Sequence, residues 1–135
     1  MATVHRINGT MRPSAQAFID DAERLLELAR VCEKSDDSVV YSYRAALRAA
    51  GALIEWAMHK RKRYPKGSAW DKLRKLDPSM STWAAHFEAH ARLASRAGMG
   101  LERGVDPTVA EQIYRQACEL VDVARGRLGY MPDVA

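Results

Sequence analysis

Apolar residues recur at the three-to-four-residue spacing of a buried helix face in four long segments of the chain. The first segment starts after Pro13 and ends at the polar stretch EKSDDS. The last segment starts at Asp106-Pro107, where an aspartate cap followed by a proline is typical of a helix start. No segment alternates with a period of two over a useful length, so the pattern predicts an all-α fold.

The second segment carries the strongest helical pattern, with apolar positions at helical spacing from Val39 to Met58. Its core-facing side chains in the stretch RAALRAAGALIEWAM are mostly small, so a neighbouring helix could approach closely. Gly51 lies inside this segment, where a glycine costs a helix roughly 1 kcal/mol relative to alanine. We therefore expect another helix to cross closely at Gly51.

A short helix and a third long helix are expected between the second and the last segments. Ser68 and Asp71 have the spacing of a capping box, and the short helix should stop at Asp77-Pro78. The third long helix should run from about Ser81 into the turn AGMGLERG. Its inner face would carry Trp83, Phe87, Ala91 and Ala94.

Together these elements predict an up-and-down four-helix bundle with one short extra helix between the second and third long helices. We expect residues 14–130 to form this single domain. Residues 1–13 show no period and are expected to be a flexible N-terminal arm, and residues 131–135 a C-terminal tail. With 135 residues, the chain is long enough to bury a sizeable core.

The composition excludes several classes of protein. Hydrophobic residues make up 47% and charged residues 28% of the chain, as in ordinary globular proteins. No apolar run approaches the ~18 residues of a membrane-spanning helix, and the first residues contain no apolar signal-peptide core. Cys32 and Cys118 have no metal-binding spacing, so we expect buried thiols in a cytoplasmic protein.

Charge is distributed unevenly along the chain. The formal net charge is +4, yet residues 1–37 hold five basic and seven acidic side chains. Residues 55–77 hold eight basic and three acidic side chains. The balance of this segment, +5, exceeds the net charge of the whole chain, +4. Such an asymmetry favours a polyanionic partner.

Four consecutive cations follow the second helix in the stretch WAMHKRKRYPKG: Lys60, Arg61, Lys62 and Arg63. Cations at the end of a helix complement its dipole and keep it soluble, which is the simpler interpretation. Four in succession exceed what a dipole needs, however, and nearby aromatic rings could stack on unpaired bases. These rings belong to Trp56, Tyr64 and Trp70. The residues alone leave both interpretations open.

Metal and cofactor chemistry have little support in the sequence. His86 and His90 are four residues apart, but HFEAH carries its glutamate at the third place, unlike the HExxH motif of zinc proteases. No Glu-x-x-His pair and no third ligand occur at a recognisable spacing. The chain also has no nucleophile motif and no glycine-rich phosphate loop, so we expect neither a metal nor a cofactor.

Two stretches resemble the HEPN superfamily of small helical domains. SDDSVVYSYRAALRAAGALIEWAM resembles the second helix of that superfamily, in which a short acidic turn leads into a Tyr/Ala-rich face. GVDPTVAEQIYRQACELVDVARGRL is similar to its last helix, and the likeness over residues 14–129 is closest to a small bacterial branch. The resemblance implies a four-helix up-and-down bundle that commonly pairs into a symmetric homodimer.

Active members of the superfamily are metal-independent ribonucleases with an Arg-x4–6-His motif near the junction of the last two long helices. The resemblance implies that the arginine steadies phosphate charge while the histidine transfers a proton. In this chain Arg92, Arg96 and Arg103 have no following histidine. No arginine stands five to seven residues before His86, His90 or His59 either.

Three hypotheses follow. The first is a non-catalytic HEPN-like protein that binds RNA or DNA through residues 60–63, with Arg92 and Arg96 as secondary contacts, or that acts as an adaptor for a protein partner. The second is a divergent ribonuclease, or a toxin, in which His90 or His86 transfers the proton. The third is a purely structural or protein-interaction bundle.

Overall fold

The structure is a computed structural model that describes residues 13–59 and 61–129, and no strand occurs among them. The prediction of an all-α fold is confirmed. The expected arm and tail lie outside the described residues, apart from Pro13. The elements are α2 (Ala15–Val31), α3 (Ser35–Met58), α4 (Ala69–Leu76), the 3-10 helix η1 (Pro78–Met80), α5 (Ser81–Glu88), α6 (Ala91–Gly98) and α7 (Pro107–Gly129).

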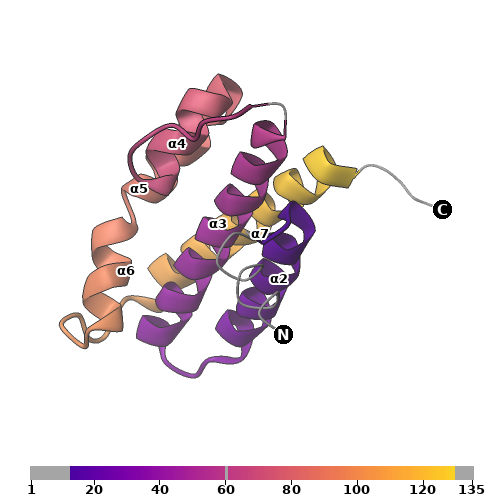
Figure 1. The fold of residues 1–135 in the computed structure, drawn as a ribbon. Coiled ribbons are helices and arrows are strands. Elements are labelled where there is room, and N and C mark those ends of the chain that lie inside the picture. Colours follow the sequence, from indigo (N-terminus) through magenta and orange to yellow (C-terminus); the bar gives the residue numbers. More distant parts are fainter. Residues whose placement is uncertain (1–12, 60, 130–135) are drawn as a thin grey trace, which may run out of the picture.

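Helix α3 is the central element of the fold, with α2 and α7 packed against it and against each other (Figure 1). Helices α4 and α6 also contact α3, so it packs against helices on several sides. Small side chains make this possible, because five alanines of α3 are completely buried: Ala45, Ala46, Ala49, Ala50 and Ala52. The alanine-rich pattern therefore marks the helix that lies at the centre.

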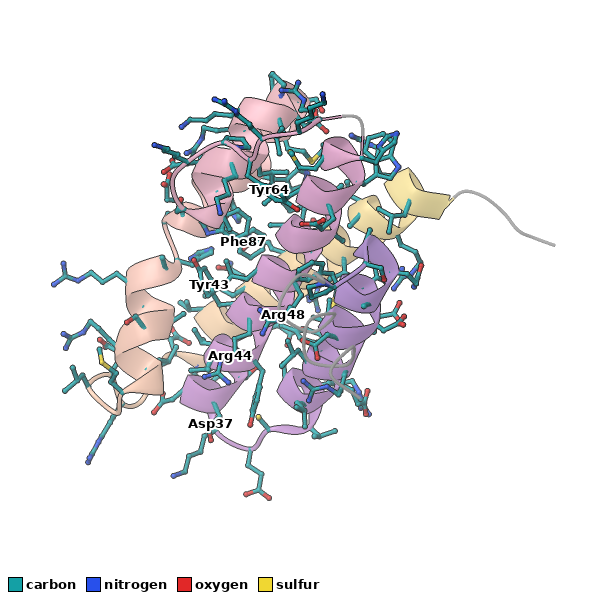
Figure 2. All side chains as sticks on the ribbon, in the orientation of Figure 1. Asp37, Tyr43, Arg44, Arg48, Tyr64 and Phe87 are labelled. Carbon is teal, nitrogen blue, oxygen red and sulfur yellow. The ribbon has the colours of Figure 1, made fainter. Side chains whose placement is uncertain are left out.

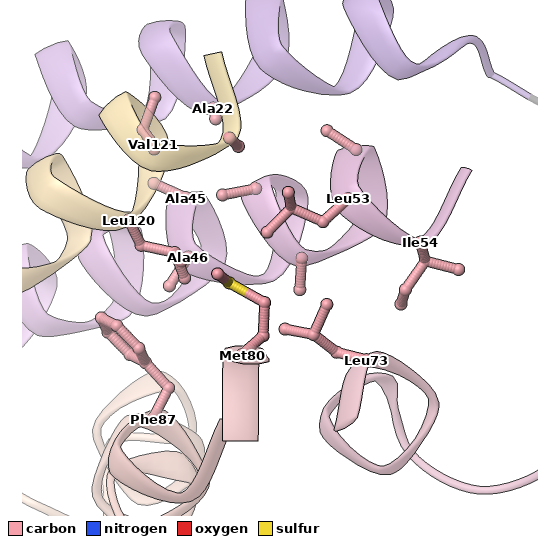
Figure 3. Close-up of a cluster of buried hydrophobic side chains, with 14 of the residues drawn as sticks. Ala22, Ala45, Ala46, Leu53, Ile54, Leu73, Met80, Phe87, Leu120 and Val121 are labelled. Atoms are coloured by element: carbon pink, nitrogen blue, oxygen red, sulfur yellow. The ribbon is translucent and has the colours of Figure 1, made fainter. Parts of the chain in front are cut away.

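Larger side chains from the surrounding elements fill the core around these alanines (Figure 3). They include Leu73 of α4, Met80 of η1, Phe87 of α5 and Leu120 of α7, each at most 6% exposed. Large residues facing small ones let the helices interdigitate at the density of a protein interior. The core thus extends from α2 to α5 through α3.

The close approach expected at Gly51 involves a side chain rather than the backbone of a neighbour. A Cβ added to Gly51 would lie 2.8 Å from two ring atoms of Phe18, which belongs to α2. Carbon atoms in van der Waals contact lie about 3.5–4 Å apart, so a methyl group does not fit without movement of the ring. Glycine is thus explained by the packing of Phe18 on α3.

The expected third long helix is instead two eight-residue helices, α5 and α6. They are separated at Ala89 and His90, where the His90 amide donates to the carbonyl oxygen of Phe87 at 2.9 Å. This is the tighter three-residue bond of a 3-10 turn. Neither glycine nor proline marks the break. The ring of His90 packs on Phe87 and reaches α7, so tertiary packing accompanies the change of direction.

Polar side chains fix the starts of two helices, α4 and α3. Ser68 and Asp71 form the predicted capping box at the start of α4. Asp36, in the first turn of α3, accepts hydrogen bonds from the backbone amides of Gly104 at 3.2 Å and Val105 at 2.8 Å. Gly104 adopts a left-handed φ of 71°, which suits glycine. Asp36 therefore ties the start of α3 to the turn that precedes α7.

Within the part of the chain that the structure describes, no helix is long and apolar enough to cross a membrane.

Candidate nucleic-acid interface

The cationic segment begins after α3 has ended. The last helical residue is Met58, and His59 caps the helix. The Arg61 amide then donates to the carbonyl oxygen of Met58 at 2.8 Å. The last turn of α3 itself contains no basic residue. Because the helix dipole acts mainly within the terminal turn, it accounts for only part of this run of cations.

Arg61, Lys62 and Arg63 are exposed and form no ion pair with any described residue. Lys60, the fourth predicted contact, lies outside the described residues. Elsewhere most arginines face a carboxylate: Arg24, Arg30, Arg48, Arg74, Arg96, Arg115, Arg125 and Arg127. The segment therefore leaves its positive charge available to an anion from outside the chain.

A solvent-open cavity of about 480 Å³ lies beside this segment. Its walls come from the start of α2, the end of α3 and the chain that follows α3. The lining residues are Ser14, Ala15, Glu55, Trp56, Met58, His59, Arg61, Lys62 and Tyr64. The structure thus brings two of the predicted cations together with an aromatic ring.

Trp56 is the exposed ring of this cavity, with 38% of its surface accessible. The Arg127 guanidinium lies 5.7 Å from the centre of its ring, close enough for a cation–π contact. Arg127 is itself held by an ion pair with Asp77. Burial alone would raise the pKa of Asp77, but hydrogen bonds from Ser79 and Arg127 keep it below its usual range. Asp77 therefore stays charged and holds the cation beside Trp56.

The other two aromatic residues expected to stack on bases have different roles. Trp70 is only 3% exposed, and its Nε1–H donates to the Tyr43 hydroxyl at 2.9 Å. It is part of the core, so the expectation that it presents a stacking face is wrong. Tyr64 is half-buried and donates its hydroxyl to Glu55 (Figure 2). Of these three aromatic residues, only Trp56 combines exposure with a position in the cavity.

Arg92 and Arg96 are not brought together with the cationic segment. They belong to α6, which packs on the N-terminal half of α3, whereas the segment follows the C-terminal end of α3 (Figure 1). Arg92 is exposed, but Arg96 pairs with Glu102 at 3.2 Å and donates to the Leu101 carbonyl oxygen. Arg96 therefore helps to hold the turn between α6 and α7.

Two further arginines lie on the visible face of α3 (Figure 2). Arg48 pairs with Asp21 of α2 at 2.7 Å. Hydrogen bonds from Arg24 and Arg48 lower the pKa of Asp21. Arg44 lines a smaller cavity of about 320 Å³ between α3 and α6 and forms no ion pair with the described residues. The sequence shows that the two arginines lie one helical turn apart. It does not show that Arg48 pairs with Asp21 while Arg44 has no such pair with the described residues.

His86 and His90 form a half-buried ring cluster beside α7. Their ring centres are 5.1 Å apart, and His90 Nε2 lies 3.3 Å from Gln116 Oε1. Burial lowers the pKa of His90, the hydrogen bond with Gln116 raises it, and the nearby His86 lowers it further, with a net decrease. His86 Nε2 is buried without a partner. No group of three metal-ligating side chains occurs among the described residues.

His59 is the histidine that the structure places beside cations. It is exposed and lines the same cavity as Arg61 and Lys62. This arrangement does not follow the Arg-x4–6-His motif, in which the arginine precedes the histidine, because here the cations come directly after His59. The run HKRKR was the available signal, and only the fold shows that it borders a cavity.

Neither cysteine provides a reactive nucleophile. Cys32 and Cys118 are free thiols, as expected, and both are half-buried. Burial is the main cause that raises the pKa of each thiol. Raising the pKa disfavours the thiolate, which is the nucleophilic form. Neither thiol is therefore favourably placed to act as a nucleophile.

The geometry of the described residues defines a small all-helical protein with exposed cations, Arg61, Lys62 and Arg63, and a cavity with an aromatic ring at one end of its central helix. The family model described as SAV_6107-like HEPN matches residues 29–125 of the chain. This match runs from the C-terminal part of α2 into α7 and covers more than half of the sequence, so the chain belongs to this HEPN family. No curated protein and no solved structure matches the chain.

Proposed function

We propose that this HEPN protein binds RNA or DNA without cleaving it, through the segment 60–63 at the end of α3. The observation that carries the proposal is a set of exposed cations, Arg61, Lys62 and Arg63, that form no ion pair with the described residues. Cations of this kind attract phosphates, and their binding releases counterions. Arg92 is a second contact in this proposal, and Arg96 a weaker one because Glu102 already neutralises it.

The test is the salt dependence of binding to a short labelled RNA. Each phosphate contact contributes about −0.7 to the log–log slope for a single strand, so removing three contacts should flatten the slope by about two. The variant is Arg61→Ala/Lys62→Ala/Arg63→Ala. The matched control, Lys34→Ala/Arg44→Ala/Arg103→Ala, removes the same charge from exposed positions that form no ion pair with described residues.

Two results would oppose this proposal. If neither RNA nor DNA binds at about 50 mM salt, where electrostatic binding is strong, the chain is not a nucleic-acid-binding protein. If both triple variants lose affinity equally, the effect follows net charge and not the segment after α3. The structural or protein-interaction hypothesis would then be preferred.

The ribonuclease hypothesis is favoured by one observation, the position of His59 in the cavity with Arg61 and Lys62. A histidine can transfer the proton while cations stabilise the phosphate charge. The experiment is incubation of labelled RNA with the protein in EDTA. Under our proposal the RNA stays intact. Cleavage that is lost in His59→Ala and kept in His90→Ala would instead assign catalysis to this cavity.

We further propose that the chain forms the symmetric homodimer common in the superfamily, and that α5 and α6 together take the place of the third long helix of an up-and-down bundle. The succession of α5 and α6 along one side of α3 supports the bundle interpretation (Figure 1).

If the chain acts as an adaptor, a protein partner would occupy the exposed surface instead of nucleic acid.

A further inference from the structure

We propose that the cavity at the end of α3 holds one unpaired base against Trp56, so that the protein prefers single-stranded nucleic acid. This inference rests on the proposed function and names its substrate class. It requires a space of suitable size, a ring that is exposed and held in place, and cations close enough to meet the adjoining phosphates.

The space is adequate for a small planar group. A cavity of about 480 Å³ falls within the range of pockets that bind small ligands. Its floor includes the aliphatic side chains of Ala15 and Met58, and its polar groups are Ser14, Glu55 and Tyr64. A flat apolar ligand with hydrogen-bonding edges, such as a nucleobase, suits this mixture of surfaces.

The ring is both exposed and held in place by neighbours. Arg127 lies over Trp56, and the His59 ring centre lies 6.0 Å from that of Trp56. Asp77 in turn fixes Arg127 through an ion pair. A ring whose orientation is already set loses less conformational entropy when a base stacks on it. Trp56 thus differs from Trp70 and Trp83, whose rings stack on Phe87.

The cations border the same cavity. Arg61 and Lys62 line it, and Arg63 follows them in the exposed segment. A base placed against Trp56 would therefore leave its sugar–phosphate backbone next to positive charge. Bases inside a duplex are already stacked and paired, so only an unpaired base can reach an aromatic ring in this way. The combination accounts for a preference for single strands.

The experiment compares three probes built on a strand of about eight nucleotides, which is within the site size of single-strand-binding domains. The probes are oligodeoxyadenylate, a hairpin whose stem pairs the same strand with oligodeoxythymidylate and so keeps it double-stranded, and an abasic strand with the same phosphates and no bases. We expect the wild-type protein to bind oligodeoxyadenylate about ten-fold more tightly than the abasic strand. This is the order of the gain in affinity that the stacking of one base on an aromatic ring provides. The hairpin should also bind more weakly than the single strand.

Variants at Trp56 assign the difference to this ring. Trp56→Ala should lose the preference for oligodeoxyadenylate but keep its affinity for the abasic strand, whereas Trp56→Phe should retain most of the preference. Circular dichroism and thermal unfolding check that both variants fold, and the wild-type comparison of probes needs no variant. Equal affinity of the wild type for all three probes would overturn this inference and leave the proposed function standing. Absence of binding to every probe would overturn this inference, and the proposed function falls with it only if the short labelled RNA is not bound either.

Discussion

The roles of individual residues in this protein depend on which side chains lie next to them. His90 is half-buried between α5 and α7 and bonds to Gln116, whereas His86 keeps a buried nitrogen without a partner. Gly51 owes its place to the ring of Phe18. His90 and Gly51 thus each owe their role to a neighbour on another helix.

The lowered pKa of His90 predicts that the protein loses stability in mild acid. The unfolded chain has the ordinary value of 6.5, and the folded value is lower. Below pH 6.5 the unfolded chain therefore binds more protons at this residue, so the free energy of unfolding falls until the pH has passed the folded value. Urea unfolding at a series of pH values measures this loss.

A variant separates His90 from the rest of the chain. His90→Gln removes the titrating group, so its free energy of unfolding should fall less between about pH 7 and pH 5 than that of the wild type. His59→Gln is the control, because His59 is exposed at the end of α3. An identical decrease in all three proteins would show that His90 does not cause it.

Helix ends are where this chain joins elements that are distant in sequence. Asp36 lies in the first turn of α3, yet its carboxylate accepts hydrogen bonds from amides that lie 68 and 69 residues further on, before α7. Asp37 shares the first turn of α3 with Asp36, is more exposed and has no such bonds. The two neighbouring carboxylates therefore share a favourable position near the positive end of the helix dipole, and only one joins two elements.

We predict that Asp36→Ala lowers the free energy of unfolding by about 1–3 kcal/mol, because it removes both bonds and leaves the half-buried Val105 amide without its partner. Asp37→Ala removes the same charge from the same turn and should cost less than about 1 kcal/mol. Chemical denaturation of both variants measures the difference. Equal costs would mean that the helix dipole, and not the link to α7, is what Asp36 provides.

At the scale of the whole molecule, α3 is surrounded within a single chain. Its five completely buried alanines pack against other helices of the same chain, so that face cannot also form a dimer contact. A homodimer must therefore use surfaces outside this face. The cationic segment and its cavity remain accessible at the end of α3 in the single chain.

We predict that light scattering gives twice the mass of one chain, and that short single-stranded RNA raises this mass without changing the number of chains. The reason is that pairing and RNA binding use different surfaces in our proposal. The Arg61→Ala/Lys62→Ala/Arg63→Ala variant should remain a dimer and lose the added RNA mass. A single-chain mass for the wild type would contradict the dimer, and RNA-dependent dissociation would contradict separate surfaces.

The sequence by itself determined the helical class, most helix ends and the cationic run, because helical periodicity, the Ser68 capping box and the Asp106-Pro107 start are local signals. Tertiary structure alone decided the break at His90, the burial of Trp70 and the ring that occupies the space beside Gly51. All three features depend on which helices pack together, and the local spacing of residues does not determine that. For the same reason, only the fold shows that Trp56 and His59 share a cavity with Arg61.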